Sequence, residues 1–252
     1  MADLAGRGVL VTRPLAQSED FVNAIEAAGG AAVCLPALEI AGLEEDAIDS
    51  QLADLPDADI TLFVSPNAAR FGIRHAQGLI GSIGPGTANA IRELGHVVDI
   101  VPDGGYNSEH LLMTPALSDI TGKTIRIVRG QSGRELLGQT LAHRGARVDY
   151  LSVYTRRRPE HPQALLDDVL SRWKSGGIHA WTIMSVETLD NFLALAGEDG
   201  AALAARTPLV TPAERVLKEA EERLPGVFVA LSQGTSADDL VEAVDGVIVP
   251  ES

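Results

Sequence analysis

The chain has 252 residues, a formal net charge of −15 and an apolar fraction of 45%, which is enough length and apolar surface for two domains. Binding to nucleic acid is not expected, because neutralising phosphates requires a basic face. The single cysteine, Cys34, excludes an internal disulfide and fits a reducing compartment. The sequence shows no signal-peptide pattern and no apolar stretch of about 18 residues, so we expect a cytoplasmic protein.

The first half of the chain is predicted to alternate short strands with helices. Residues 8–12 form an apolar strand, and Ser18 can cap the helix that follows and ends at Gly29–Gly30. Residues 32–40 are extended, and Pro36 favours an edge strand or a connecting ribbon there. The remaining elements are an acidic helix at residues 44–54, strands at 60–64, 79–83 and 97–101, and helices that open at Ser65-Pro66-Asn67, Gly84-Pro85-Gly86-Thr87 and Ser108.

The second half follows the same route. Strands alternating with helices of about 10–15 residues predict parallel sheets with right-handed crossovers. The last helix has a capping box, Ser236-Ala237-Asp238-Asp239. The other expected elements are a strand at residues 124–128, a loop at 130–133, a helix at 134–143, an extended segment at 148–154, a helix at roughly 162–173, and strands at 180–184, 209–211 and 227–231, each followed by a helix.

The order of these elements contains an internal repeat. Residues 7–40 and 123–156 are two copies of one pattern, and a second pattern recurs in the segments after each copy. Matched positions are Arg13 and Arg129, Glu19 and Glu135, Gly29 and Gly145, Leu35 and Leu151, then Ser65 and Ser185, Pro85 and Pro212, Ser108 and Ser236, and Leu112 and Leu240. A duplicated α/β chain predicts two similar lobes, with a ligand site placed between them.

The repeat also predicts how the lobes are connected. The interrupted extended segments at residues 33–40 and 149–156 occupy equivalent places, and if they pair as a ribbon the chain crosses between lobes twice. The terminal lobe would then be discontinuous, with residues 1–36 and 155–252. Residues 41–150 would form the middle lobe.

Candidate binding residues lie at the predicted carboxyl ends of the strands, where ligands bind in doubly wound sheets. Most of these segments lead into helix N-termini, which present unpaired backbone N–H groups to anions. Such a series suits a ligand with many carboxylates, although each residue can equally be an ordinary helix cap. The candidates are Thr12, Arg13, Ser65, Asn67, Gly86, Thr87, Arg129, Gly130, Arg134, Ser185 and Thr211.

The arginines have two interpretations. Arg13 and Arg129 directly follow buried strands at matched positions, where each could bind a carboxylate with its forked N–H groups. The alternative is a salt bridge to a neighbouring Asp or Glu. The run Arg156–Arg158 is more typical of a solvated segment at the crossover.

The residue spacing lends little support to a metal site or a nucleotide-binding site. The six histidines lack metal-ligand spacing, and there is no cysteine pair. Asn89 stands where Gly84-Pro85-Gly86 would need the third glycine of a dinucleotide fingerprint, and residues 130–134 are not a Walker A loop. Cys34 lies in an apolar segment and is interpreted as packing.

Six short motifs occur in order along essentially the whole chain. They are Val11-Thr12-Arg13-Pro14, Val64-Ser65-Pro66-Asn67, Ile83-Gly84-Pro85-Gly86-Thr87-Ala88, Ser108-Glu109-x-Leu111-Leu112, Arg129-Gly130-x-x-Gly133-Arg134-x-x-Leu137 and Val153-Tyr154. Taken together, these motifs resemble those of the uroporphyrinogen-III synthase family. Two positions depart from the family pattern: Met184-Ser185 replaces the common Thr-Ser, and Thr211-Pro212-Ala213 replaces a glycine-containing turn.

The resemblance implies an α/β fold of two flavodoxin-like lobes with parallel sheets, joined by a two-stranded β ribbon. It also implies a monomeric, cofactor-independent lyase of tetrapyrrole (heme) biosynthesis. Such an enzyme cyclises the linear polycarboxylate hydroxymethylbilane, inverting ring D and losing water, to uroporphyrinogen III. Tyr154 matches the family's Val-Tyr position, and a phenol, protonated at neutral pH, can help the hydroxyl leave. The alternative for Tyr154 is a packing role at the ribbon.

Two rival functions fit parts of the sequence. A non-catalytic two-lobe sensor or binding protein for an anionic metabolite would show the same repeat and the same anion-binding helix termini. A two-lobe transferase that uses a nucleotide sugar would need a complete glycine fingerprint with a ribose-binding acid, and the sequence does not contain the pair.

Overall fold

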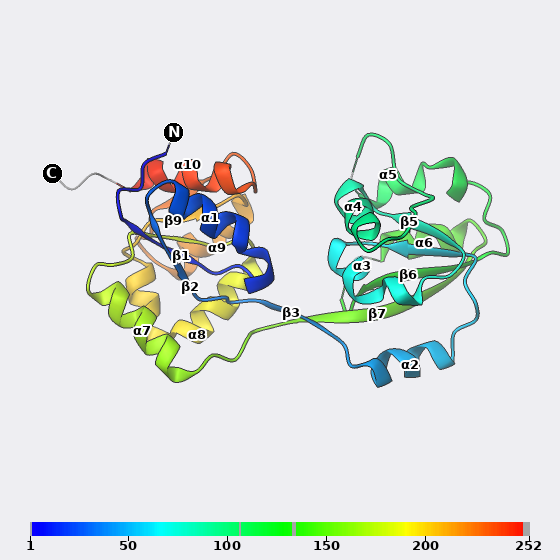
Figure 1. Cartoon of the computed structure of the whole chain (residues 1–252), viewed down its shortest axis with the longest axis horizontal. Coiled ribbons are helices and arrows are strands. Elements are labelled where there is room, and N and C mark those ends of the chain that lie inside the picture. The colour runs from blue at the N-terminus through cyan, green and yellow to red at the C-terminus, as the bar shows by residue number, and fades with distance from the viewer. Residues whose placement is uncertain (1, 106, 133–134, 249–252) are drawn as a thin grey trace. The chain divides into compact units, whose positions relative to one another are not determined.

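The computed structural model describes residues 2–105, 107–132 and 135–248. The chain divides into two compact units (Figure 1). Unit 1 consists of Met1–Glu39 and Arg157–Ser252, and unit 2 of Ile40–Arg156. In the described part of the chain each unit contains a five-stranded sheet. No described helix has both the length and the apolarity to cross a membrane.

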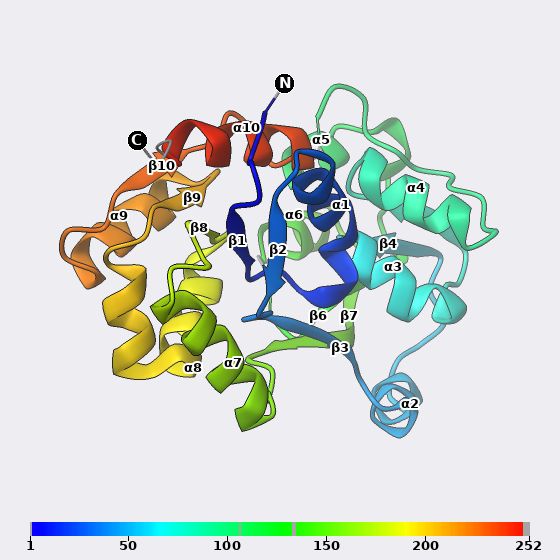
Figure 2. The same cartoon turned by 60° about the vertical axis from the view of Figure 1, so that its left-hand side comes forward.

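Unit 1 is built on a parallel sheet with the strand order β10-β9-β8-β1-β2. Helices α1 and α10 cover one face of this sheet, and α7, α8 and α9 pack on the other (Figure 2). The strands are β1 (Gly8–Val11), β2 (Ala31–Cys34), β8 (Ala180–Thr182), β9 (Leu209–Thr211) and β10 (Val229–Leu231). The helices are α1 (Glu19–Ala27), α7 (Gln163–Lys174), α8 (Val186–Ala204), α9 (Glu214–Arg223) and α10 (Ala237–Val247), with the short 3-10 helix η1 (Leu15–Gln17) before α1.

Unit 2 has the strand order β3-β7-β6-β4-β5, and β7, β6, β4 and β5 pair in parallel. One face of the sheet packs on α5 and α6, the other on α2, α3 and α4. The strands are β3 (Glu39–Gly42), β4 (Ile60–Phe63), β5 (Leu79–Ser82), β6 (Thr124–Gly130) and β7 (Arg147–Arg157). The helices are α2 (Glu45–Ala53), α3 (Pro66–Gly72), α4 (Pro85–Glu93), α5 (Ser108–Leu112) and α6 (Leu136–His143), with η2 (Ile73–His75) and η3 (Pro115–Leu117).

The internal repeat corresponds to an equivalence between the two sheets. The order β2-β1-β8-β9 in unit 1 matches β7-β6-β4-β5 in unit 2. The strand that would match β10 is reduced to a single bridge between Gly81 and Ile100. Strands β3 and β7 are neighbours in the sheet, and each spans a boundary between the units. Residues 33–34, expected in the ribbon, belong to β2 instead.

Three local expectations were wrong, and each has a polar cause. The Ser18 side chain does not cap α1, because its hydroxyl donates to the Pro14 carbonyl at 3.0 Å instead. The strand expected at residues 97–101 is reduced to a bridge at Ile100, and the N–H of Ile80 donates to the Asp99 carboxylate at 2.8 Å rather than to a backbone carbonyl of that segment. Ser108 is not the cap of α5, since the Asn107 side chain accepts the N–H of His110 at 3.0 Å. The capping box at Ser236 is present as predicted.

Candidate functional site

Two adjacent pockets open at the carboxyl ends of the strands of unit 2. They share Val64 and Ile83, which directly follow β4 and β5. We name them the Arg129 pocket and the α4 pocket. The Arg129 pocket has a volume of about 310 Å³ and is lined by Val64, Ile83, Asn107, Ser108, Ile127, Arg129, Gly130, Ser132, Leu137 and Tyr154. The α4 pocket has a volume of about 390 Å³ and is lined by Val64, Ser65, Pro66, Ile83, Gly84, Pro85, Gly86 and Thr87.

Arg129 is the cation of the first pocket. It is the second-last residue of β6, and its guanidinium carbon lies 4.1 Å from the centre of the Tyr150 ring. Its Nε and Nη1 atoms are buried and have no hydrogen-bond partner in the described part of the chain. The expected alternative, a salt bridge to an Asp or Glu, is not found for Arg129 among those residues. An unsatisfied buried donor costs about 1–3 kcal/mol, which an anionic ligand in this pocket could recover.

Tyr154 reaches the same pocket because β7 contains an extra residue. The register of β6 and β7 shifts after Arg129, so that Gly130 pairs with Tyr154 rather than with Val153. Bulges of this kind re-aim side chains near active sites. A Cβ atom at position 130 would lie 2.8 Å from the Tyr154 ring, so glycine is needed for this close approach. The bulge and Gly130 together set the position of the phenol.

Ser65 links Tyr154 to the second pocket. Its hydroxyl accepts the N–H of Ala68 at 3.0 Å as the cap of α3, and it lies 3.3 Å from the Tyr154 hydroxyl. The phenol therefore has one hydroxyl neighbour that is itself fixed by a helix terminus. The Tyr154 ring also packs against Phe71, with ring centres 6.1 Å apart. This geometry can hold a phenol O–H toward a ligand in the Arg129 pocket.

The α4 pocket is formed by a helix N-terminus without a side-chain cap. Gly84 is the N-cap residue, Pro85 is the first helical residue, and the first N–H groups of a helix have no partner inside it. Nothing lies within 4 Å of a Cβ atom built on Gly86. Thr87 is 3% exposed over the whole residue, so its hydroxyl has little access to a ligand. Asn67, in the first turn of α3, is not a lining residue of either pocket.

The predicted site residues of unit 1 are largely engaged by the protein itself. The Thr12 hydroxyl is fully buried and donates to the Thr182 carbonyl at 2.6 Å. Ser185 caps α8 by accepting the N–H of Thr188 at 3.1 Å. The Thr211 hydroxyl, also buried, accepts the N–H of Ala213 at 3.3 Å. Of the three, only Ser185 is a helix cap; Thr12 bonds to a carbonyl of β8, and α9 has no side-chain cap.

Arg13 is bonded more fully by the protein than Arg129, although its Nε is also buried without a hydrogen-bond partner in the described part of the chain. Its Nη2 donates to the Thr235 carbonyl at 3.1 Å, and its guanidinium carbon lies 5.3 Å from the centre of the Phe21 ring. Burial lowers the pKa of Arg13, and Asp20 opposes that shift. Arg134, the other predicted arginine, lies outside the described residues.

Four polar residues around the Arg129 pocket were not among the candidates from sequence. Asn107, Ser108 and Ser132 line the pocket, and the Tyr150 ring contacts the Arg129 guanidinium. Asn107 could have been found, because Asn is a preferred N-cap and precedes the Ser108-Glu109 motif. The Tyr150 contact joins two strands, and nothing in the local sequence indicates it.

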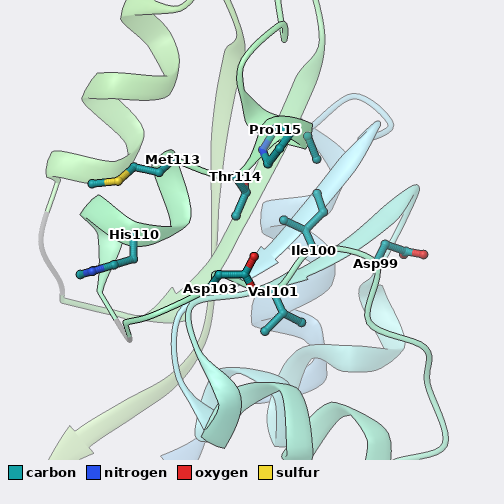
Figure 3. Close-up of a pocket in the computed structure, with 9 residues that line it drawn as sticks. Asp99, Ile100, Val101, Asp103, His110, Met113, Thr114 and Pro115 are labelled. Atoms are coloured by element: carbon teal, nitrogen blue, oxygen red, sulfur yellow. The ribbon is translucent and has the colours of Figure 1, made fainter.

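A third pocket, of about 330 Å³, lies where α5 faces the segment around Ile100 (Figure 3). Asp99, Asp103 and His110 line it, but the side chains of Asp99 and His110 point away from one another in Figure 3. The imidazole instead contacts Asn107, with 2.6 Å between Nδ1 and Oδ1. No group of three His, Cys, Asp or Glu side chains suited to a metal ion occurs among the residues that the structure describes.

The fold and the site define a class: an α/β protein of two parallel-sheet units, with an arginine-lined pocket at the strand ends of one unit. Residues 19–242 match the model of the family described as uroporphyrinogen-III synthase HemD. The chain is 32% identical to uroporphyrinogen-III synthase of Salmonella typhimurium over 74% of this chain and 79% of that protein. It is 30% identical to the Escherichia coli uroporphyrinogen-III synthase over the same shares.

A crystal structure of a mutant uroporphyrinogen III synthase from Thermus thermophilus superposes with a TM-score of 0.54, at 18% identity, and covers 93% of this chain and 96% of that chain. This likeness confirms the predicted α/β fold with two parallel sheets. The chain belongs to the uroporphyrinogen-III synthase family.

Proposed function

We propose that this protein catalyses the cyclisation of hydroxymethylbilane to uroporphyrinogen III, with inversion of ring D and loss of water. Family membership supports the reaction, and the site supports its placement in unit 2. The observation that carries the placement is the convergence of Ser65, Arg129 and Tyr154, from three separate motifs, at the neighbouring strand ends of one sheet.

In this reaction the main task of the protein is to control the conformation of the substrate. Loss of the ring A hydroxyl gives a delocalised azafulvenium cation, and ring D then attacks through its substituted carbon to give a spiro intermediate. That intermediate fragments and closes again with ring D turned over. Since the substrate can close unaided to the type I isomer, the protein must hold rings A and D in the spiro-forming geometry.

Tyr154 is proposed to assist the departure of the ring A hydroxyl. Its hydroxyl, placed by the β7 bulge and by Ser65, donates a proton or a hydrogen bond to the leaving oxygen. General-acid assistance of this kind contributes about 10²–10⁴-fold to a rate. Ser65 positions the phenol and does not itself take part in the chemistry.

The substrate carboxylates are proposed to bind at two places in unit 2. Arg129 offers unused N–H donors on a cation, and a charge-assisted bond to a carboxylate is stronger than a neutral one. The N-terminus of α4 offers the backbone N–H groups of Gly86 and Thr87. The contacts expected of Thr12, Arg13, Asn67, Gly130, Arg134, Ser185 and Thr211 stay predictions.

The decisive experiment is an isomer assay. Freshly generated hydroxymethylbilane is incubated with the purified protein without added cofactor, and the oxidised porphyrin isomers are separated by chromatography. We expect the type III isomer to dominate. Formation of the type I isomer alone, at the spontaneous rate, would reject the proposal and favour the anion-binding sensor.

We also propose that the protein acts in the cytoplasm, as a monomer and without a cofactor. Sedimentation at assay concentration should give the mass of one chain. Dialysis against a chelator should leave the rate of type III formation unchanged. A dimer mass, or activity that returns only on adding a metal, would contradict the respective part of this proposal.

A further inference from the structure

The Arg129 guanidinium is held in its pocket without a carboxylate. Its Nε and Nη1 are buried and unpartnered within the described residues, and it stacks 4.1 Å above the Tyr150 ring. Buried cations are ordinarily paired, because moving a charge out of water is costly. Something other than an ion pair therefore fixes this one. The aromatic ring is the contact that the structure provides.

The fold presents Tyr150 to Arg129 through strand register. Tyr150 on β7 pairs with Ile127 on β6, so its side chain lies on the sheet face shared by Ile127 and, two residues on, Arg129. The ring packs into the apolar cluster beneath α5 and α6. Its hydroxyl end rests against Gly138 of α6, where an added Cβ would collide with the oxygen. Gly138 thus provides the space in which the ring lies.

We propose that Tyr150 is a positioning residue that holds Arg129 ready for a substrate carboxylate. A ring face attracts a guanidinium through its π electrons and leaves the in-plane N–H groups unoccupied. A carboxylate in the place of Tyr150 would have occupied those groups. This inference rests on the proposed function for the identity of the ligand, and on geometry for the role of Tyr150.

The kinetic test compares two substitutions of the same tyrosine. Tyr150→Phe keeps the ring face, and Tyr150→Leu removes it with a similar apolar volume. We expect Tyr150→Leu to raise KM about three- to tenfold, the range of a partly desolvated cation–π contact, with kcat within about twofold of wild type. Tyr150→Phe should restore KM to nearly the wild-type value. Equal KM values for the two variants would overturn the proposal.

A double-mutant cycle separates positioning from packing. Arg129→Gln alone should raise KM, and adding Tyr150→Leu to it should raise KM no further, because the ring then has no guanidinium to hold. An equal effect of Tyr150→Leu in both backgrounds would show that the ring acts independently of Arg129, and would also overturn the proposal.

A spectroscopic measurement tests the contact between Tyr150 and Arg129 in the wild-type protein. Its result depends neither on catalysis nor on whether the Tyr150→Leu variant folds. In the wild-type protein, the Arg129 Nε–H signal, assigned by its loss in Arg129→Gln, should be shifted upfield by the Tyr150 ring and remain so in Tyr150→Phe. A signal at the position of a free arginine would overturn the inference even if the enzyme is active. A wild type that forms only the type I isomer, with the shifted signal present, would reject the proposed function alone.

Discussion

The two units share one topology but use their strand ends differently. In unit 1, Arg13 donates to the Thr235 carbonyl and Thr12 to the Thr182 carbonyl. In the described chain, the matched Arg129 of unit 2 keeps two buried nitrogen atoms without a partner, whereas Arg13 keeps one, its Nε. Both units retain a capping serine after the next strand, Ser65 or Ser185. The two units therefore share their helix caps, and their matched arginines differ in how many bonds the protein supplies to them.

A bulge lies in the longer ladder of unit 2. β1 and β2 of unit 1 pair from Gly8 with Ala31 to Val11 with Cys34, and that ladder ends before Arg13, the residue matched to Arg129. The equivalent pair in unit 2, β6 and β7, shifts register after Arg129 and brings Tyr154 beside Gly130. A bulge at a strand end changes one side chain's direction and leaves the helices in place, so chemistry can diverge while topology is kept.

The largest effect is expected from Tyr154→Phe, which removes the hydroxyl and keeps the ring. We expect kcat to fall by about 10²–10⁴-fold, the usual contribution of a general acid, with the melting temperature nearly unchanged. Tyr150→Phe is the matched control, because it removes a hydroxyl from the same unit and should keep most of the activity. The rate at which the type III isomer forms is measured for both variants in stopped-time assays. Equal rates for the two variants would remove Tyr154 from the chemistry without affecting family membership.

Gly130→Ala tests the bulge itself. The new Cβ would lie 2.8 Å from the Tyr154 ring, so the ring must move, and small misplacements of a catalytic group can cost on the order of 10- to 100-fold in rate. Gly246→Ala in α10 is the control, since nothing lies within 4 Å of its Cβ and Ala favours a helix. Steady-state kcat should fall in the first variant only. An unchanged kcat in Gly130→Ala would mean that the position of Tyr154 is not critical.

Substituting each arginine by glutamine compares the two units directly. Arg129→Gln should raise KM about tenfold or more, because it removes a charge-assisted bond to a carboxylate, while stability stays within about 1 kcal/mol. Arg13→Gln removes the bond to Thr235 and the contact with Phe21, so it should lower stability by about 1–2 kcal/mol. Urea unfolding and KM are measured on both. A KM increase of the same size in Arg13→Gln would show that unit 1 contributes an equal carboxylate contact.

The fold was predictable from sequence because its signals are local. Apolar runs ended by Ser or Gly gave the strand ends, and the Ser65, Ser185 and Ser236 caps form as expected. Asn107 replaced Ser108 as a cap because two good capping residues stand side by side, and local rules do not choose between them.

The site was predictable only in part, because its decisive features join distant segments. The motifs indicated Ser65, Arg129 and Tyr154, but the register shift that brings Tyr154 beside Gly130 depends on how two strands pair. Arg126 shows the same limit: it lies inside an apolar strand, yet it is 2% exposed and bonds to Gln77 and to the Pro56 carbonyl. Such contacts are set by tertiary packing, and no window of sequence contains both partners.

The capping serines offer a smaller, matched comparison. Ser65→Ala and Ser185→Ala should each lower the free energy of unfolding by about 1 kcal/mol, the usual value of an N-cap. Only Ser65→Ala should also lower kcat, because Ser65 lies 3.3 Å from the Tyr154 hydroxyl. Denaturant melts and type III formation rates are compared for the pair. An equally large loss of kcat in Ser185→Ala would show that residues of both units position catalytic groups.

The smallest effect concerns the ion pair between β3 and β7, where Arg157 donates two bonds to Glu39 at 2.9 and 3.3 Å. The hydrogen bond from Arg157 holds the pKa of Glu39 below its ordinary value. A carboxyl whose folded pKa is depressed contributes stability above its unfolded pKa, and that stability is lost as the pH falls through the folded pKa. The loss should therefore occur below about pH 4.5, the region of an ordinary Glu.

Glu39→Gln should thus be slightly less stable than wild type near neutral pH, and the two should converge toward about pH 3, where wild-type Glu39 is protonated. The effect should be small and should shrink in salt, because both side chains are exposed. Asp199→Asn is the control: its carboxylate pairs with Lys174 through one bond, so a smaller pH-dependent difference is expected than for the two-bond Arg157 pair. Melting temperatures of wild type and both variants across this pH range test these expectations. A larger effect for Asp199→Asn would mean that the second bond to Glu39 adds no stability where the chain crosses between the units.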